Sequence, residues 1–576
     1  MNHSSDKPAR RLPEWFWGLL LAVGTVLAYQ PVWHAGFIWD DDAHLTANPC
    51  IVGPLGFKDI WTSSAAVYYP LVLTSFWIQH AIWGLNPLPY HLVDVAFHAA
   101  CGLLLWRVLR RLNIPGAWLG AALWTLHPVQ VESAAWITEL KNTQSCFFYL
   151  LAIFFFLKWR EAANPPFEIR RSKFAGWLYA LTLLCATLAI LSKSSTVMLP
   201  VVFGLCWWWM DGRWRWRNSF RLVPFFLISA AAGGWTIWEQ QFHAGALGSA
   251  WVQGWPERLL VSSRDVWFYL GKLLWPHPLI FIYPRWTVDA SRPAAWLPAM
   301  AIVAVFCVLW LARRRMRPFF FAFAYFLVSL FPALDFFNVY FFRYSFVGDH
   351  FQYLASMGPL ALAGAGITAA FGSLRKINPF LKPAFCAALL LSLGALAWRQ
   401  CRMFTDNETL WSATIERNPN AFLAYADIGV ILFNRGKIDE AWADYWKSIE
   451  LNPDSDEAYS DIGVILNLRG RTRDAITVYQ KALRINPNNS QARYNLALSL
   501  FQEGRLDEAI VQFQKVLETG PDSAIVRCNL GNALFNAGRV DESIVQFKRA
   551  LEINPSLAEA RSGLTNALMQ AGSRDK

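Results

Sequence analysis

Charged residues are scarce in this chain of 576 residues, of which 16% are Asp, Glu, Lys or Arg and 55% are hydrophobic. So little charge argues against an ordinary soluble domain, and the length exceeds that of one domain. Many segments reach the roughly 20 apolar residues that cross a bilayer. The composition therefore predicts a polytopic membrane protein.

Cysteine spacings typical of a metal site or a redox site are missing among the nine cysteines. Most of them lie inside apolar runs, where they are expected to pack as small core residues. Residues 13–30 are apolar but have no A-x-A-like cleavage site, so they are predicted to be a signal anchor. The six cysteines in apolar runs are Cys101, Cys146, Cys185, Cys206, Cys307 and Cys386.

Acidic residues are few in residues 1–402, with 18 against 33 basic residues, whereas residues 403–576 have 23 acidic and 19 basic. The basic excess lies between apolar segments, as the positive-inside rule predicts for cytoplasmic connections. We therefore expect contact with the bilayer and no nucleic-acid partner.

Placing every basic cluster in the cytoplasm gives about eleven spanning helices, with the N-terminus inside and residues 403–576 outside. Long extracytoplasmic loops are expected at 31–89 and 240–293. Within the second loop, residues 257–283 could be interfacial, re-entrant or two short spans. The predicted spans are 13–30, 90–108, 115–129, 143–159, 175–192, 195–210, 220–239, 294–312, 318–335, 354–371 and 383–399.

A period of 34 residues appears after Arg402. Proline recurs at 419, 453, 487, 521 and 555, and glycine recurs at 436, 470, 504 and 538. This period is typical of tetratricopeptide repeats, each of which is a helix–turn–helix. The fold is therefore predicted to be all-α: a membrane domain over 1–402, then a half-repeat, four full repeats over 422–555 and a partial fifth. Such arrays bind protein partners or act as rigid spacers.

Ionisable residues of the membrane domain gather on the face predicted to be extracytoplasmic. The first are Asp40, Asp41 and Asp42, directly after an apolar segment. His91, Asp94 and His98 follow at helical spacing, where ionisable groups usually face a polar cavity. His127, Glu132, Glu139, Lys141 and Lys193 lie on the same face.

These residue types suit one kind of chemistry. A carboxylate can accept the proton of a hydroxyl as that oxygen attacks the anomeric carbon of a sugar. A second acid can hold a metal or tune the first, and cations can stabilise a leaving phosphate. A solvated acidic loop is the plainer alternative for the aspartates.

The string of motifs resembles one family, the transmembrane and tetratricopeptide-repeat-containing O-mannosyltransferases with a GT-C glycosyltransferase fold, in their bacterial form. The matching segments are "GFIWDDDAHLTANP" (36–49), "YYPLVLTSFW" (68–77), "GLNPLPYHLVDVAFH" (84–98), "LHPVQVESAAWITELKN" (126–142), "LSKSSTVMLP" (191–200), "LGKLLWPHPLIFIYPRW" (270–286) and "DHFQYLASMG" (349–358).

The resemblance implies a polyprenyl-phosphate sugar as donor, an extracytoplasmic protein or glycan acceptor bound by the repeats, and a bacterial inner membrane. The family's paired acids fall on Asp40 and Asp41, one of which would be the catalytic base or a ligand of a divalent metal. Asp42 is extra. The family's late arginine is absent, and His350 beside Asp349 is expected to replace it. The predicted donor and lipid-phosphate residues are Lys193, Arg264, Asp349, His350 and Tyr353; the predicted supporting residues are Asp42, His91, Asp94, His98, His127, Glu132 and Lys141.

Two other functions fit parts of the sequence. A membrane-anchored scaffold would use only the repeats, and its aspartates would be plain loop. A transporter of lipid-linked sugars would need a polar path to the cytoplasmic face, whereas the acids and histidines lie mainly near one face. A membrane glycosyltransferase is the function that the sequence favours.

Overall fold

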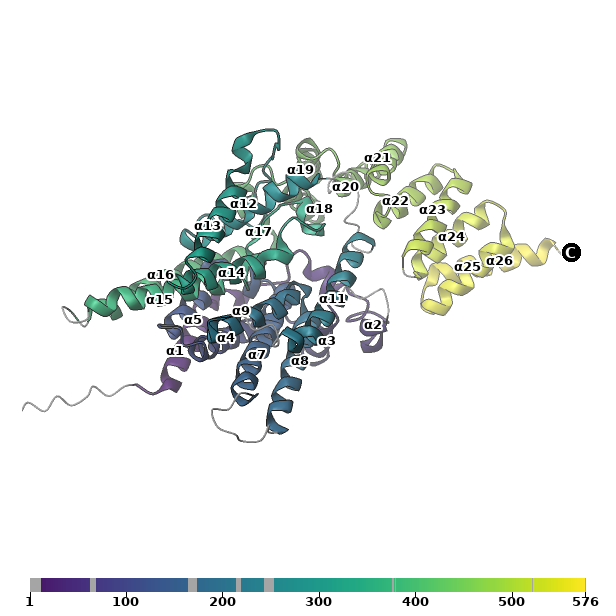
Figure 1. Ribbon diagram of the computed structural model, residues 1–576. Helices are drawn as coiled ribbons and strands as arrows, with labels where there is room; N and C mark the ends of the chain where they lie inside the picture. Colours follow the sequence, from purple (N-terminus) through teal and green to yellow (C-terminus); the bar gives the residue numbers. More distant parts are fainter. Residues whose placement is uncertain are drawn as a thin grey trace, which may run out of the picture. The chain divides into compact units, whose positions relative to one another are not determined.

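The computed structural model describes residues 12–62, 69–163, 173–213, 219–242, 253–374, 378, 380–520 and 522–574. Within these ranges every regular element is helical, which confirms the all-α prediction (Figure 1). The chain divides into two compact units, Met1–Ala413 and Thr414–Lys576.

Helices lie at all eleven predicted spans of the first unit. They are α1 (Glu14–Ala28), α4 (Pro87–Arg111), α5 (Ala117–Leu126), α7 (Leu140–Ala163), α8 (Lys173–Ser192), α9 (Leu199–Asp211), α11 (Val223–Phe242), α13 (Leu297–Leu311), α14 (Arg317–Leu330), α15 (Met357–Leu374) and α16 (Leu381–Cys401). Among the described residues six helical segments are long and apolar enough to cross a membrane, and they contain α4, α7, α8, α11, α13 and α16. The first unit is therefore a multi-pass membrane domain.

Helix α4 shows how the sequence sets the helix ends. Asn86 caps its start by accepting a hydrogen bond from the backbone N–H of Leu88 at 3.3 Å, and Pro87 occupies the first turn. Arg110 and Arg111 lie in the last turn, where cations meet the negative end of the helix dipole.

The two predicted loops contain helices that the hydropathy pattern did not reveal. Residues 31–89 include α2 (Phe57–Thr62) and α3 (Pro70–Trp83), and 14 residues are too few to span a bilayer upright. The undecided segment 257–283 consists of one helix, α12 (Trp255–Leu274), and a non-helical stretch. The buried side of α12 is mixed, with Ser262, Ser263 and Asp265 among apolar residues, and charged residues such as Arg264 and Lys272 outside that side also interrupt the apolar run.

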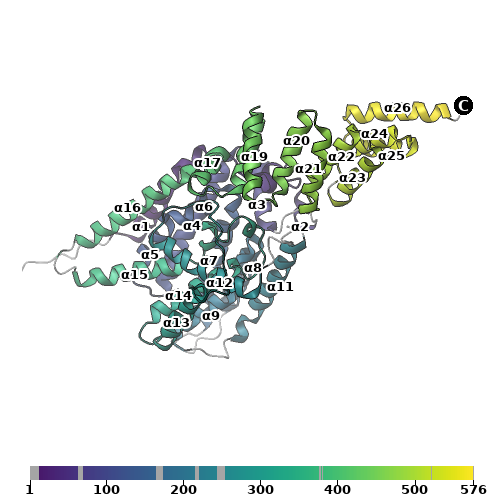
Figure 2. The same cartoon turned by 90° about the horizontal axis from the view of Figure 1, so that it is seen from above.

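Small residues let helices α5 and α15 pack closely. A Cβ atom added at Gly364 would lie 2.5 Å from the backbone nitrogen of Gly120, and one added at Gly120 would lie 3.0 Å from the Cα of Ala361. Close approach through glycine and alanine is the usual way for spanning helices to associate. Figure 2 shows α15 and α16 diverging from each other, with α5 beside α15.

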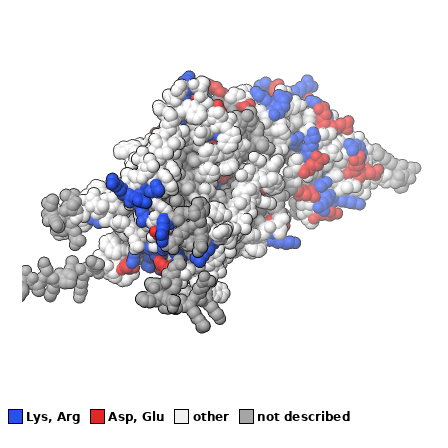
Figure 3. Space-filling view, viewed as in Figure 1, with Lys and Arg blue, Asp and Glu red and all other residues white. Residues whose placement is uncertain are grey.

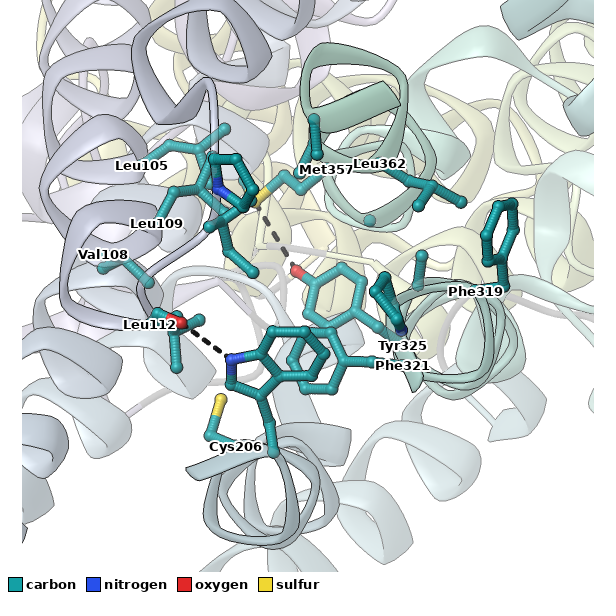
Figure 4. Close-up of a pocket in the computed structure, with 18 of the residues that line it drawn as sticks. Leu105, Val108, Leu109, Leu112, Cys206, Phe319, Phe321, Tyr325, Met357 and Leu362 are labelled. Atoms are coloured by element: carbon teal, nitrogen blue, oxygen red, sulfur yellow. Dashed lines mark hydrogen bonds between the residues drawn. The ribbon is translucent and has the colours of Figure 1, made fainter. Parts of the chain in front are cut away.

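An apolar cavity of about 320 Å³ lies inside the membrane unit (Figure 4). Its labelled walls are Leu105, Val108, Leu109 and Leu112 of α4, Cys206 of α9, Phe319, Phe321 and Tyr325 of α14, and Met357 and Leu362 of α15. Among the described residues that line it, Tyr325 alone has a hydroxyl group, which donates to the carbonyl oxygen of Leu354 at 3.3 Å. The described part of the cavity wall has no charged side chain.

The second unit is built from antiparallel helix pairs, which confirms the predicted tetratricopeptide fold. The pairs are α18 (Phe422–Asn434) with α19 (Ile438–Leu451), α20 (Asp456–Leu468) with α21 (Thr472–Ile485), α22 (Ser490–Gln502) with α23 (Leu506–Thr519), and α24 (Ala524–Asn536) with α25 (Val540–Ile553); α26 (Ala558–Arg574) follows. Charged side chains gather on this unit, whereas most of the visible surface of the membrane unit is uncharged (Figure 3).

Glycines explain why the repeats hold their period. Gly436, Gly470, Gly504 and Gly538 end the first helices at φ between 72° and 78°, a region that favours glycine. Gly463 lies against the ring of Tyr479, where an added Cβ would lie 2.5 Å from Cε1. The turn glycine recurs in all four repeats, and the close contact between glycine and an aromatic ring recurs in three of them, since the third repeat has Ala497 at that position.

Candidate functional site

Seven ionisable residues of the membrane unit form one connected group, which we call the charged cluster. Its members are Asp40, Glu132, Glu139, Lys141, Lys193, Asp349 and His350. They come from the segment after α1, from α6 (Val131–Ala135) and η4 (Ile137–Glu139), from the starts of α7 and η5 (Ser194–Met198), and from η11 (Asp349–Gln352).

The three consecutive aspartates lie in three different environments. Asp41 is fully buried, and it accepts hydrogen bonds from the backbone N–H groups of Ile38 and Thr138, each at 2.8 Å, and from the Thr138 hydroxyl at 2.5 Å. Asp42 is exposed and accepts a hydrogen bond from Thr46. Asp40 lies between these extremes, with 34% of its side chain exposed.

His44 contacts Asp40 one helical turn later. Its Nδ1 atom lies 3.2 Å from the Asp40 carboxylate and 3.0 Å from the Asp40 carbonyl oxygen. Residues Asp42–Thr46 form a π-helical turn, η2, a conformation often found at functional sites. Burial alone would raise the pKa of Asp40, but His44 and then Lys141 outweigh it and lower that pKa. Asp40 is therefore an ionised carboxylate at neutral pH.

Trp39 fixes the backbone directly before Asp40. It has a φ of 39°, which is uncommon for a residue with a side chain, and its ring stacks on Trp136 at 5.5 Å between centroids. Phe281 also packs edge-on against Trp39 at 5.3 Å. Aromatic packing from distant segments thus holds the turn that presents Asp40.

Two lysines share one buried carboxylate. Glu139 is fully buried, and its two carboxylate oxygens lie 2.9 Å from Nζ of Lys141 and 3.2 Å from Nζ of Lys193. Asn142 donates hydrogen bonds to Glu139 and, at 3.0 Å, to the carbonyl oxygen of His350. Lys141 also lies over the rings of Tyr69 and Trp136 at 5.5 and 5.4 Å. The two ammonium groups leave a net positive charge beside Asp40.

A second acid group ties the motif of residues 349–358 to α6. Glu132 lies 2.6 Å from Nδ1 of His350 and accepts a hydrogen bond from the backbone N–H of Asp349 at 3.0 Å. Tyr283 donates to Asp349 at 3.2 Å. Burial raises the pKa values of both Glu132 and Asp349, and burial lowers that of His350 to about 3. His350 is therefore a neutral hydrogen-bonding group in this structure.

Several predicted site residues lie in a buried hydrogen-bond network outside the charged cluster. His98 contacts the Tyr353 hydroxyl through Nδ1 at 2.6 Å and the carbonyl oxygen of Thr125 through Nε2 at 2.9 Å. The Thr143 hydroxyl donates to Asp94. These bonds join α4, α5, α7 and the 349–358 motif, so His98, Asp94 and Tyr353 have a structural task in this arrangement.

The remaining predicted residues are placed as follows. His91 is buried on α4, and Nε2 of His127 lies 3.1 Å from the carbonyl oxygen of Leu273. Arg264 is exposed and stacks over Trp286 at 5.4 Å, so it lies outside the charged cluster. Tyr68, which begins one quoted motif, falls outside the described residues.

In the described part of the chain, no group of three His, Cys, Asp or Glu side chains is placed to hold a metal ion. Asp41 receives three hydrogen bonds, so its oxygens are engaged. Asp40 and Asp42 are the aspartates of the triplet with exposed carboxylate surface, and Asp40 is the one that also meets His44 and Lys141.

Sequence reasoning missed His44 and Tyr283 as site residues, and it placed Glu139 on the extracytoplasmic face without giving it a role. The i, i+4 spacing of Asp40 and His44 was a usable signal, because it fits one turn of helix. Glu139 had a weaker signal, since its partner Lys193 lies 54 residues away. Nothing in the local sequence joins Tyr283 to Asp349.

Family models match the second unit only. Models described as "Tetratricopeptide repeat" match residues 431–490, 466–528 and 500–545, and one described as "TPR repeat" matches residues 531–572. Similar solved structures include the "Crystal structure of YrrB: a TPR protein with an unusual peptide-binding site", at 23% identity and a TM-score of 0.24, covering 34% of this chain and 96% of that one. The "Crystal structure of MamA protein" is 25% identical with a TM-score of 0.24, covering 26% and 83%.

One curated relative matches three quarters of the chain, and others match about a third. Protein O-mannosyl-transferase Tmtc1 of Drosophila melanogaster is 29% identical over 191 residues, which are 31% of this chain and 21% of that protein. Protein O-mannosyl-transferase TMTC2 of Mus musculus is 29% identical over 194 residues, 31% and 22% of the two chains. Protein O-mannosyl-transferase F38B6.6 of Caenorhabditis elegans is 22% identical over 459 residues, 75% and 62%. The chain thus spans less than two thirds of each of these proteins. It combines tetratricopeptide repeats with a multi-pass unit, and it is similar at low identity to proteins named O-mannosyl-transferases.

Proposed function

We propose that this protein is an integral-membrane glycosyltransferase that moves a mannose-like sugar from a polyprenyl-phosphate donor to an acceptor hydroxyl. In this proposal the reaction takes place on the extracytoplasmic side of a bacterial inner membrane. The observation that carries the proposal is a partly exposed carboxylate, Asp40, that interacts electrostatically with Lys141, one of two ammonium groups that share one buried acid.

Asp40 is the base in this proposal. Its lowered pKa keeps it ionised, and the exposed part of its side chain is open to an acceptor. It accepts the proton of the acceptor hydroxyl while that oxygen forms a bond to the anomeric carbon of the sugar. Asp41 holds the loop and takes no proton from substrate.

Lys141 and Lys193 receive the leaving group. The bond between the anomeric carbon and the phosphate oxygen breaks, and the negative charge that grows on the phosphate is stabilised by these cations. Glu139 keeps both ammonium groups at one place, since two unpaired cations would repel each other in a buried site. The positive charge needed for the leaving phosphate is thereby pre-organised.

The repeats present the acceptor, which in this proposal is a protein hydroxyl. Helix-pair arrays commonly bind extended peptides in a groove. The relatives named protein O-mannosyl-transferases support the same reaction class. A tetratricopeptide scaffold without catalysis is the alternative function.

The test is transfer of radiolabelled mannose from polyprenyl-phosphate mannose to protein in membranes that contain the chain. Asp40→Asn should lower the rate by about 100-fold or more, because a general base contributes 10²–10⁴-fold. Asp42→Asn removes the same charge two residues away, in an exposed position, and should keep the rate near that of the wild type. Equal transfer by Asp40→Asn and Asp42→Asn at equal protein levels would refute the assignment of Asp40, and no transfer by the wild type would favour the scaffold.

A further inference from the structure

The buried side of α12 carries polar atoms that no described residue engages. Asp265 is fully buried, and neither of its carboxylate oxygens has a hydrogen-bond partner within the described chain. Ser262, one turn earlier, is 2% exposed and its hydroxyl oxygen also has no such partner. An isolated buried carboxylate is costly, so its retention calls for a ligand or a partner.

Two further side chains extend this set at the start of α12. Arg258 donates hydrogen bonds to the carbonyl oxygens of Gln253 at 3.3 Å and Asp335 at 2.9 Å, which brings these two residues to the helix. The amide oxygen of Gln253 and one carboxylate oxygen of Asp335 are likewise without partners among the described residues. We call Gln253, Ser262, Asp265 and Asp335 the α12 polar face.

The chemistry of the α12 polar face selects a kind of ligand. The Gln253 amide oxygen accepts hydrogen bonds, and the Ser262 hydroxyl both accepts and donates them. Burial raises the pKa of Asp265, so its carboxyl group can accept a hydrogen bond at one oxygen and donate one from the other. Sugar hydroxyls match this set because each of them both donates and accepts, and among the described residues no group of three His, Cys, Asp or Glu side chains is placed to hold a cation.

The α12 polar face leads to the charged cluster. Tyr269, one turn after Asp265, accepts a hydrogen bond from the backbone N–H of Gly348 at 3.1 Å. The next residue, Asp349, is bonded to Tyr283 and, through its backbone N–H, to Glu132. A ligand that meets Asp265 is thus one helical turn from the residues that hold the 349–358 motif.

We propose that Asp265 and Ser262 accept hydrogen bonds from hydroxyl groups of the hexose that the lipid donor carries, and that they determine which sugar is transferred. This inference rests on the proposed function and assigns its sugar specificity to α12. Asp335 and Gln253 complete the acceptor set on the same side. Asp265 is a binding residue in this proposal and takes no part in proton transfer.

The test compares transfer from polyprenyl-phosphate mannose with transfer from donors that carry 2-, 3-, 4- or 6-deoxy-mannose. The wild type should use at least one deoxy donor much less well than mannose. Asp265→Asn should reduce that discrimination, measured as the ratio of kcat/KM values, by about tenfold or more, because an engaged buried acceptor rejects an analogue that lacks its hydroxyl. Ser262→Ala should act in the same direction with a smaller change.

Glu257→Gln is the matched control, because it also replaces an acid by its amide on α12 but at a partly exposed position in the first turn. The inference is overturned if Asp265→Asn and Ser262→Ala discriminate between the mannose and deoxy-mannose donors as strongly as Glu257→Gln does. A change only in Mn²⁺ or Mg²⁺ dependence would overturn it as well, since the face would then hold a cation.

A binding measurement separates failure of this inference from failure of the proposed function. Mannose 1-phosphate should raise the thermal unfolding midpoint of the full chain in detergent, and Asp265→Asn should abolish that shift while Glu257→Gln keeps it. If mannose 1-phosphate shifts the midpoint in this way but no transfer occurs, the proposed function is refuted and the sugar site stands. If the wild type transfers mannose but Asp265→Asn changes neither the midpoint shift nor the discrimination, the sugar site is refuted and the proposed function stands.

Discussion

Neighbouring carboxylates differ in chemistry here because their hydrogen-bond partners differ. Asp41 receives three donors in a buried site, whereas Asp40 keeps part of its carboxylate exposed and meets His44 and Lys141. Burial raises the pKa of Asp41 to about 7, but it does not prevent ionisation of Asp40, since nearby cations outweigh it. Two adjacent aspartates thus differ in role: Asp41 holds the loop, and Asp40 is the proposed base.

Lys193 gives the clearest pH prediction at this scale. Burial lowers the pKa of its ammonium group to about 8, although Glu139 partly opposes the shift. Raising the pH from 7 to 9 should therefore remove most of its charge, and KM for the lipid donor should rise by about tenfold. Lys193→Arg keeps its charge at pH 9, so its KM should change much less over the same range.

The same pKa shift predicts that folding stability rises with pH while donor binding weakens. This opposite direction is the control, because a general loss of folding would lower both. An unfolded lysine has a pKa near 10.4, so between pH 8 and pH 10 the unfolded chain binds more protons at this position than the folded chain does. The contribution of Lys193 to folding stability should therefore improve as the pH rises. A KM that stays constant from pH 7 to 9 in the wild type would exclude Lys193 from donor binding.

At the scale of elements, the repeat helices depend on the contact between glycine and an aromatic ring. An added Cβ at Gly463 would lie 2.5 Å from the ring of Tyr479, which is packed inside the repeat core. Gly463→Ala should therefore lower the free energy of unfolding of the repeat unit by about 1–3 kcal/mol through overpacking. Proteolysis of the full chain at increasing urea, followed with a C-terminal epitope, would measure the change.

Gly572→Ala is the control for that change, because nothing lies within 4 Å of a Cβ at Gly572 on the last helix. It should leave the urea midpoint unchanged or raise it slightly, since alanine is the better helix former. Equal midpoints for the two variants would show that the 34-residue period does not depend on this contact.

These elements also show what the sequence could predict. The repeats and the apolar helices follow from periodicity and hydropathy, which are local properties of the chain. Helix α12 was undecided because Arg264, Asp265 and Lys272 interrupt its apolar run, and the sequence does not show that only Asp265 of the three is buried. The pairs Glu139–Lys193 and Glu132–His350 join residues 54 and 218 positions apart, so only the packing of helices reveals them. Asp40 and Asp41 were predicted together because the motif alone does not show which of them is buried.

At the scale of the whole molecule, the charge distribution predicts the side of the membrane on which the second unit lies. Basic residues outnumber acidic ones by 33 to 18 before residue 403, and they gather between apolar segments. Cytoplasmic placement of those clusters and an odd number of crossings put the repeats in the extracytoplasmic space, where Asp40 is also expected. Catalysis on an acceptor held by the repeats requires this shared compartment.

Reporter fusions after the last residue test that arrangement. Alkaline phosphatase, which folds only after export, should be active there, and green fluorescent protein should be dark. The opposite pair of signals would place the repeats in the cytoplasm, and the proposed presentation of acceptors to Asp40 would fail. A fusion after Leu112, in the basic connection between α4 and α5, is the internal control, because it should give the cytoplasmic pattern whichever side the repeats occupy.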